Sequence, residues 1–101
     1  MNGLGGDDHM SGGGGNDRVV GGDGIDDVIG DGGNDDLSCG GGNHRVVGGD
    51  GNDKLSGGPG DDLFVGGSGE DTFKCGTRGN DNIGDFNPNG GDTKSNDCEI
   101  F

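Results

Sequence analysis

The sequence predicts an all-β fold, a flattened parallel solenoid in which about 18 residues make one coil. Three observations favour this fold. The chain of 101 residues contains 30 glycines and no alanine, and glycine costs about 1 kcal/mol relative to alanine inside a helix. Apolar residues recur every nine positions over most of the chain. Opposite charges fall side by side when every second nonapeptide is aligned.

The nine-residue period runs through eight consecutive copies, from Gly3 to Lys74. Position four is Gly in every copy, and position six is Asp in seven of the eight, with His44 as the exception. A ninth, weaker copy covers residues 76–84 and follows one inserted residue, Cys75. Position eight is apolar throughout, at Met10, Val19, Val28, Leu37, Val46, Leu55, Phe64 and Phe73.

Each copy is expected to form one turn and one short strand. Side chains alternate faces along a strand, so positions seven to nine fit a three-residue strand whose middle, apolar residue points inward. Gly at positions one, two and four of the turn tolerates positive φ and close backbone approach. We expect the repeats to span residues 3–84, followed by a C-terminal cap or tail over 85–101. The expected strands are residues 9–11, 18–20, 27–29, 36–38, 45–47, 54–56, 63–65 and 72–74.

The charges at position seven predict which copies stack on one another. Neighbouring strands lie about 4.7–4.9 Å apart, so the outward side chains of every second copy become neighbours if two copies make one coil. Opposite charges then lie side by side, as cross-strand pairing favours, whereas stacking each copy on the next would bring like charges together. The two columns read Arg18, Asp36, Lys54 and Thr72, and His9, Asp27, Arg45 and Leu63.

The composition argues against several classes of function. There are 20 acidic residues against 6 Lys and Arg, giving a formal charge of −14, which disfavours binding to nucleic acids and to anionic membrane surfaces. No stretch of ten apolar residues is present, so no membrane span is expected. Only 23% of residues are hydrophobic, and such a chain needs a further source of folding free energy.

The unit G-G-x-G-x-D-x-U-x, with U apolar, resembles the RTX, or hemolysin-type, calcium-binding nonapeptide repeat, and the resemblance covers residues 3–84. It implies a parallel β-roll whose stacked turns bind Ca²⁺ through carboxylates and backbone oxygens. Because Ca²⁺ takes six to eight oxygen ligands, one turn supplies half a site and two stacked turns supply a whole one.

The resemblance implies a ligand for almost every copy. The implied carboxylates are those of Asp8, Asp17, Asp26, Asp35, Asp53, Asp62, Asp71 and Asp81. The implied turn glycines, at positions two and four, are Gly13, Gly15, Gly22, Gly24, Gly33, Gly49, Gly51, Gly58, Gly60, Gly67 and Gly69.

Calcium sites are expected between copies two apart. Five such pairs have both carboxylates, and five ions would reduce the formal charge from −14 to −4. Two further pairs include His44 and are expected to be weak or empty; seven ions would mean that His44, or Asn43 beside it, still supports binding. The five pairs are Asp8 with Asp26, Asp17 with Asp35, Asp35 with Asp53, Asp53 with Asp71, and Asp62 with Asp81.

His44 and the three cysteines allow other interpretations. We interpret His44 as a degenerate copy rather than a transition-metal site with Cys39, because two ligands do not complete a zinc site. The odd number of cysteines leaves one thiol unpaired or intermolecular. Cys39 and Cys75 are about two coils apart, which is too far for a disulfide. Cys75 and Cys98 are therefore candidates for a disulfide that holds residues 85–101 over the last coil and suits an extracellular setting.

The expected function is that of a non-catalytic, calcium-binding structural module, secreted or at the cell surface, which folds when Ca²⁺ binds. The sequence contains no catalytic triad, EF-hand loop or phosphate-binding loop. One alternative is the C-terminal repeat part of a larger secreted enzyme or toxin, such as a protease, lipase or hemolysin. Another is an adhesive or ice-binding solenoid, which the lack of a threonine column disfavours.

The residues at position nine offer the one candidate surface for a protein partner. The odd-numbered copies carry Ser11, Ile29, Val47 and Val65 there. These residues would offer a short apolar stripe if they faced outward. The preferred interpretation places them at the sheet edge, partly covered.

Overall fold

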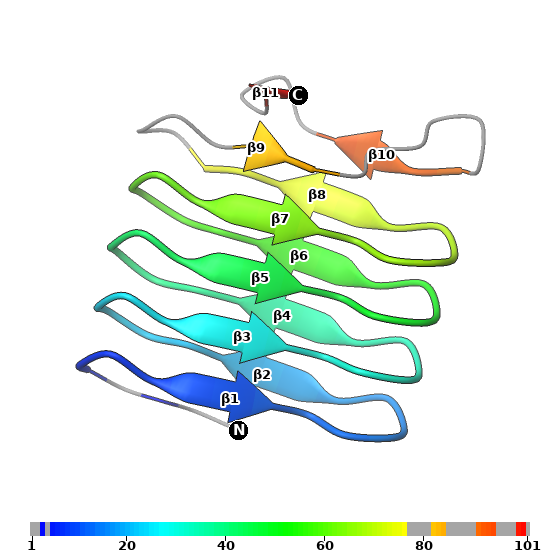
Figure 1. The fold of residues 1–101 in the computed structure, drawn as a ribbon, viewed down its shortest axis with the longest axis horizontal. Helices are drawn as coiled ribbons and strands as arrows, with labels where there is room; N and C mark the ends of the chain where they lie inside the picture. Colours follow the sequence, from blue (N-terminus) through cyan, green and yellow to red (C-terminus); the bar gives the residue numbers. More distant parts are fainter. Residues whose placement is uncertain (1–2, 4, 77–81, 85–90, 95–98, 101) are drawn as a thin grey trace.

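The computed structural model describes residues 3, 5–76, 82–84, 91–94 and 99–100, and these form two parallel sheets that face each other (Figure 1). No helix occurs among the described residues, so the predicted all-β solenoid is confirmed. Its strands are β1 (His9–Ser11), β2 (Arg18–Val20), β3 (Asp27–Ile29), β4 (Asp36–Ser38), β5 (Arg45–Val47), β6 (Lys54–Ser56), β7 (Leu63–Val65), β8 (Thr72–Lys74), β9 (Asn82–Ile83), β10 (Thr93–Lys94) and β11 (Glu99–Ile100).

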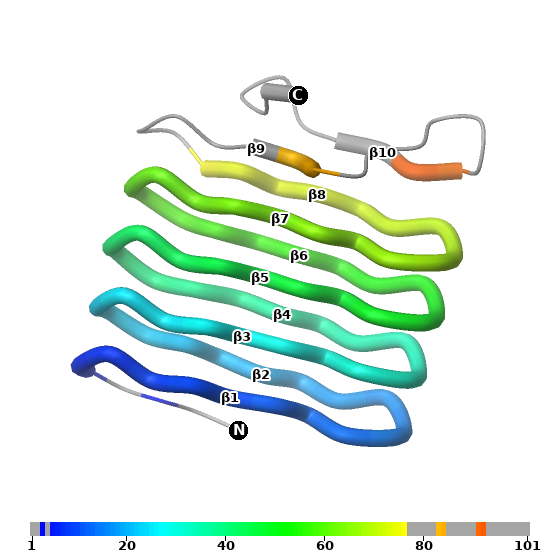
Figure 2. Tube along the Cα trace, viewed as in Figure 1, coloured from blue at the N-terminus to red at the C-terminus, as the bar shows by residue number. Residues whose placement is uncertain are grey.

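Successive strands alternate between the two sheets. One sheet has the order β1-β3-β5-β7-β9-β11 and the other β10-β8-β6-β4-β2, and the paired strands run parallel. From β1 to β8 each strand pairs with the strand two copies away, as in Met10 opposite Val28 and Leu37 opposite Leu55. The predicted coil of two copies is therefore confirmed, and Figure 2 shows the chain winding as a flat spiral.

The core is a single layer of inward side chains between the sheets. The molecule measures 36 × 30 × 15 Å, and its thickness leaves room for little more than this one layer. All eight predicted core residues are buried, as is Ile83. The rings of Phe64 and Phe73 meet edge to face across the layer, with centroids 6.1 Å apart. Burial of about one side chain per nine residues is a small return for the entropy of ordering them.

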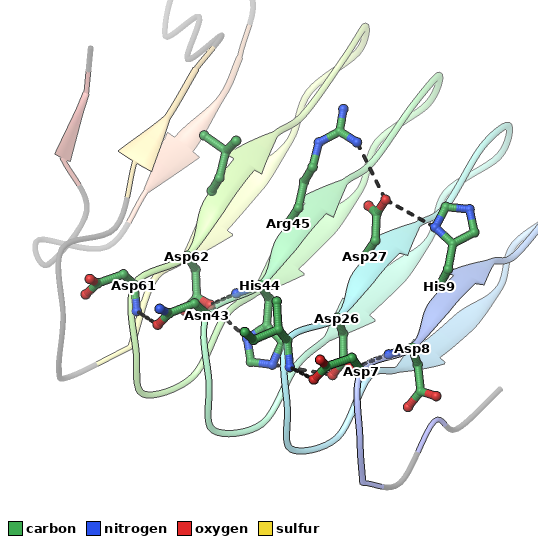
Figure 3. A pocket seen from close by; sticks show the side chains of 12 residues that line it. Asp7, Asp8, His9, Asp26, Asp27, Asn43, His44, Arg45, Asp61 and Asp62 are labelled. Atoms are coloured by element: carbon green, nitrogen blue, oxygen red, sulfur yellow. Dashed lines mark hydrogen bonds and ion pairs between the residues drawn. The ribbon is translucent and has the colours of Figure 1, made fainter.

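The outward charges pair across neighbouring strands as predicted. Asp27 lies 3.1 Å from His9 Nδ1 and 3.6 Å from an Arg45 guanidinium nitrogen, and Figure 3 shows the three side chains projecting on the same side. Exposed pairs of this kind contribute under about 1 kcal/mol, so they mark the register more than they stabilise it. Ile29 and Val47 are half-buried, in agreement with a partly covered position nine.

The structure corrects the position of the inserted residue. Gly76 packs on the carbonyl of Gly58, two copies earlier, just as Gly67 packs on Gly49. Cys75 therefore keeps the nine-residue register, at position one. Ile83 pairs with Phe64, whereas the strict period would pair Phe64 with residue 82. The insertion therefore lies between Gly76 and Ile83.

Candidate metal centres

The position-six aspartates lie where each turn enters its strand, and the inner ones are almost completely buried. Asp26, Asp35 and Asp53 have at most 2% of their surface exposed. Asp62 and Asp71 are equally buried, whereas Asp8 and Asp17 in the first coil are half-buried. The stacking places these carboxylates in two columns, one for the odd-numbered and one for the even-numbered copies. Asp81 lies outside the described residues, and its role stays a prediction.

One oxygen of each inner carboxylate cross-links neighbouring coils. Oδ1 of Asp53 accepts a hydrogen bond of 2.8 Å from the backbone N–H of Asp35, 18 residues earlier. The same bond recurs along both columns and fixes the orientation of the carboxylates. Oδ1 retains a second lone pair, so this bond does not exclude a metal ligand. The other donor–acceptor pairs are Asp8–Asp26, Asp17–Asp35, His44–Asp62 and Asp53–Asp71.

The second oxygen of these carboxylates is buried without a hydrogen bond. This holds for Oδ2 of Asp8, Asp17, Asp26, Asp35 and Asp53. An ionised oxygen in such a place costs several kcal/mol unless a cation compensates it. Burial accordingly raises the pKa of the Asp35 and Asp53 carboxyls, and neighbouring carboxylates, Asp17 for Asp35 and Asp35 for Asp53, raise it further.

The turn backbone brings oxygens from two coils into the same space. A Cβ added to Gly30 would lie 2.6 Å from Asp35 Oδ2 and 2.8 Å from the carbonyl oxygen of Gly48, in the next coil of the same column. A Cβ on Gly48 would meet Asp53 Oδ2 and the Gly66 carbonyl in the same way. Gly30 and Gly48 therefore need to be glycine, because a carboxylate and a carbonyl oxygen converge where a side chain would begin. The sequence analysis did not include position one among the site residues.

All eleven predicted turn glycines adopt positive φ, between 76° and 118°. At Gly33, φ is 103° and a Cβ would collide with the carbonyl oxygen of Gly15. The turns therefore stack too closely for any larger residue at this position. The structure confirms the predicted backbone conformation, while the role of these residues as calcium ligands stays a prediction.

These donors fit calcium better than a softer metal. Hard carboxylate and carbonyl oxygens are the ligands that Ca²⁺ prefers. In the part of the chain that the structure describes, no three His, Cys, Asp or Glu side chains are placed to hold a metal ion by themselves. A calcium site here would therefore need further oxygen ligands, and the carbonyl oxygens that converge with carboxylates at Gly30 and Gly48 can supply them.

His44 occupies the gap between two carboxylates of the odd column. Its Nδ1 lies 2.8 Å from Asp62 Oδ1 and its Nε2 lies 3.4 Å from Asp26 Oδ2, with all three side chains fully buried (Figure 3). The ring thus stands in both of the gaps that the sequence predicts to be weak or empty.

The cysteines differ in their environments. Cys39 is a free, buried cysteine. Burial, together with the nearby carboxylates of Asp62 and Asp26, raises the pKa of its thiol to about 12, so it is protonated at neutral pH. Cys75 is buried and disulfide-bonded. Cys98 lies outside the described residues, so the Cys75–Cys98 pairing stays a prediction.

A second ladder, at position five, was missed by the sequence analysis. Oδ1 of Asn34 accepts a 2.8 Å hydrogen bond from the N–H of Asn52, which in turn accepts one from the N–H of Glu70. Asp7, Asn16 and Asn43 act in the same way. The signal was present, because position five is Asn or Asp in six of the eight copies.

Comparison with known proteins agrees with this geometry. The family model of the RTX calcium-binding nonapeptide repeat matches residues 1–28, 11–43 and 40–73. Comparisons with curated proteins and with solved structures gave no match. Within the described residues, no helix has the length and apolar character to cross a membrane. The matched segments span more than half of the chain, which therefore belongs to the RTX calcium-binding nonapeptide repeat family.

Proposed function

We propose that this chain is a structural module whose folding depends on calcium. It would be disordered without the metal and would form the β-roll when Ca²⁺ binds between stacked turns. One observation carries the proposal: the Oδ2 atoms of Asp35 and Asp53 are buried without a hydrogen bond, beside carbonyl oxygens of the next coil.

The energetic reason is the imbalance between the core and the charge. The apolar core is only one layer thick, so it stabilises the fold weakly, while the small molecule has a formal net charge of −14, which opposes folding. Without a cation, the buried carboxylates of each column repel one another. An ion between two coils removes this repulsion and ties the coils together, so the free energy of metal binding becomes free energy of folding.

The proposed ions occupy the gaps between carboxylates of the same column. The repeats supply five such gaps, including the one between Asp62 and Asp81. The gaps on either side of His44 would stay weak or empty, because its ring already contacts Asp26 and Asp62. Turn glycines at positions two and four would supply backbone oxygens to complete each ligand shell.

We also propose an extracellular, non-catalytic setting for this module. Membership of the RTX repeat family supports it, because such repeats are typical of secreted proteins. Calcium is a structural ligand in this proposal, and the buried aspartates hold a cation rather than act as acids or bases. The predicted Cys75–Cys98 disulfide would also suit an oxidising environment.

Far-UV circular dichroism during a calcium titration tests the proposal. The expected result is a cooperative change from a coil spectrum to a β spectrum at millimolar Ca²⁺. Mg²⁺ should not produce it at the same concentration, because Mg²⁺ demands near-octahedral geometry and gives up its water reluctantly. A β spectrum that is already complete in calcium-free buffer would contradict the proposal. So would a coil spectrum that persists at about 10 mM Ca²⁺, which is about tenfold above the dissociation constant of the weakest extracellular sites.

A further inference from the structure

The even-numbered sheet continues past the last recognisable copy of the repeat. In β10, Thr93 pairs with Thr72 and Lys94 pairs with Phe73 of β8. Gly91 packs against the side chain of Glu70 in the same register. Residues 91–94 therefore stack on residues 70–73, with an offset of 21 residues instead of 18. They also lie beyond residue 73, where the family match ends.

Asp92 takes the place of a position-six aspartate in this segment. It is 5% exposed, and its Oδ1 accepts a hydrogen bond of 2.9 Å from the backbone N–H of Asp71. The same bond joins Asp53 N–H to Asp71 Oδ1 at 3.0 Å, one coil earlier. Asp92 thus completes an uninterrupted column of five carboxylates: Asp17, Asp35, Asp53, Asp71 and Asp92.

We propose that Asp92 and Asp71 form a further calcium site at the C-terminal end of this column. The inference rests on the proposed function and adds a ligand that the repeat pattern does not contain. Its support is the bond from Asp71 N–H to Asp92 Oδ1, which repeats the bond from Asp35 N–H to Asp53 Oδ1 earlier in the same column. In that column the Oδ2 atoms of Asp35 and Asp53 are buried without a hydrogen bond. The site raises the expected number of ions from five to six and ties residues 91–94 to the roll.

The competing explanation is that Asp92 only accepts a hydrogen bond. Asp92→Asn separates the two roles, because an amide oxygen still accepts the bond from Asp71 N–H but is a weaker ligand than a carboxylate. Asp7→Asn is the matched control. Asp7 Oδ1 accepts the N–H of Ile25 at 2.9 Å, and asparagine already occupies this position-five role in other copies.

Isothermal titration calorimetry with Ca²⁺ on the full chain tests the proposal, and the readout is the difference in stoichiometry. Asp92→Asn should bind one ion fewer than the wild type, and Asp7→Asn should bind the same number as the wild type. Equal stoichiometry for Asp92→Asn and the wild type would overturn the Asp92 site while leaving the proposed function intact. A wild type that binds no calcium would overturn both.

A second measurement does not depend on the folding of a variant. In ¹³C-labelled wild-type protein that is already folded at saturating Ca²⁺, replacement of Ca²⁺ by La³⁺ should shift the carboxyl carbon resonances of both Asp92 and Asp35, while that of Asp7 should stay in place. A shift at Asp35 without one at Asp92 would also overturn the site. Shifts at both residues would support it, even if Asp92→Asn failed to fold.

Discussion

At the scale of single residues, Asp26, Asp35 and Asp53 each use their two carboxylate oxygens differently. Oδ1 of Asp53 accepts the N–H of Asp35 and so holds two coils in register. Oδ2 is buried without such a bond. The hydrogen bond to Oδ1 stabilises the stack with or without bound metal, whereas the buried Oδ2 favours the stack only when a cation is present. His44 breaks the rule, because a ring stands where the seven other copies have a carboxylate.

Replacing His44 with aspartate should restore the column of carboxylates in the odd-numbered copies. His44→Asp removes the ring that contacts Asp26 and Asp62 and supplies a carboxylate to each neighbouring gap. We expect calorimetry to show two more calcium ions per chain than in the wild type. Asn16→Asp is the control, since it adds the same negative charge at an exposed position five of the other column and should leave the number of ions unchanged. Equal stoichiometry for His44→Asp and the wild type would contradict the assignment of the gaps.

At the scale of the repeat element, neighbouring coils are cross-linked in both directions. At position six the later coil supplies the acceptor, as in Asp35 N–H to Asp53 Oδ1. At position five the earlier coil supplies it, as in Asn52 N–H to Asn34 Oδ1. These bonds order the turns, which contain no apolar core of their own. The strands contribute most of the buried apolar residues of the described coils, with Cys39 and Cys75 beside them, so the two parts of each repeat depend on different forces.

The strand layer should be sensitive to loss of its largest side chains. Phe64 is fully buried and packs edge to face on Phe73, so Phe64→Ala should lower the free energy of unfolding by about 3–5 kcal/mol. Urea denaturation at saturating Ca²⁺ measures this change. Leu63→Ala is the matched control: Leu63 is adjacent but 40% exposed, and its loss should cost far less. Similar losses for the two variants would show that the layer is not the apolar core.

The strands and the coil could be predicted from the sequence because their signals are strictly periodic. An apolar residue every nine positions and opposite charges in every second copy fix both the strand and its partner. The ladder at position five was missed because Asn in a turn is also expected from its local turn preference. Its role here depends on a partner 18 residues away, which only the stacked structure reveals.

The C-terminal features could not be predicted because their spacing departs from the period. Asp92 follows Asp71 by 21 residues instead of 18, although both are followed by threonine. The extra residue was placed at Cys75 because that residue interrupts the glycine pattern. The stacking of Gly76 on the carbonyl of Gly58 shows that Cys75 keeps the nine-residue register. The register of a coil depends on how its backbone packs on the neighbouring coil, which the identity of one side chain does not reveal.

At the scale of the whole molecule, the fold is a slab 15 Å thick that carries a formal charge of −14. Each coil contacts mainly the coils above and below it, so stability is a sum of similar interfaces. The buried carboxylates lie in these interfaces. The proposed function therefore predicts that the slab is stable only if its interfaces contain counter-charge, which protons or calcium ions can supply.

Without calcium, acid should promote the fold. Burial raises the pKa of Asp35 and Asp53 above the ordinary value of 3.8. Because the folded-state pKa exceeds the unfolded one, the stability gained on protonation is present in full below the unfolded pKa and is lost as pH rises through the folded pKa. We expect β structure, followed by circular dichroism in calcium-free buffer, to increase as the pH is lowered from 7 toward 4.

At saturating Ca²⁺ the sign should reverse, because protons compete with the metal for the same carboxylates. Acidification should then release calcium, which an ion-selective electrode detects. High salt at pH 7 is the control for general charge screening and should not reproduce the effect of acid in calcium-free buffer. A metal-free chain that loses β structure on acidification would be inconsistent with the raised pKa values.

Small-angle X-ray scattering of the full chain, with and without calcium, tests most directly whether calcium folds the molecule. The folded chain has a Cα radius of gyration of 11.9 Å, whereas an unfolded chain of this length has one of about 30 Å. We predict a value near the larger one in calcium-free buffer at pH 7 and a fall to near the smaller one at saturating Ca²⁺. A compact chain in the absence of calcium, or an expanded chain in its presence, would contradict calcium-dependent folding.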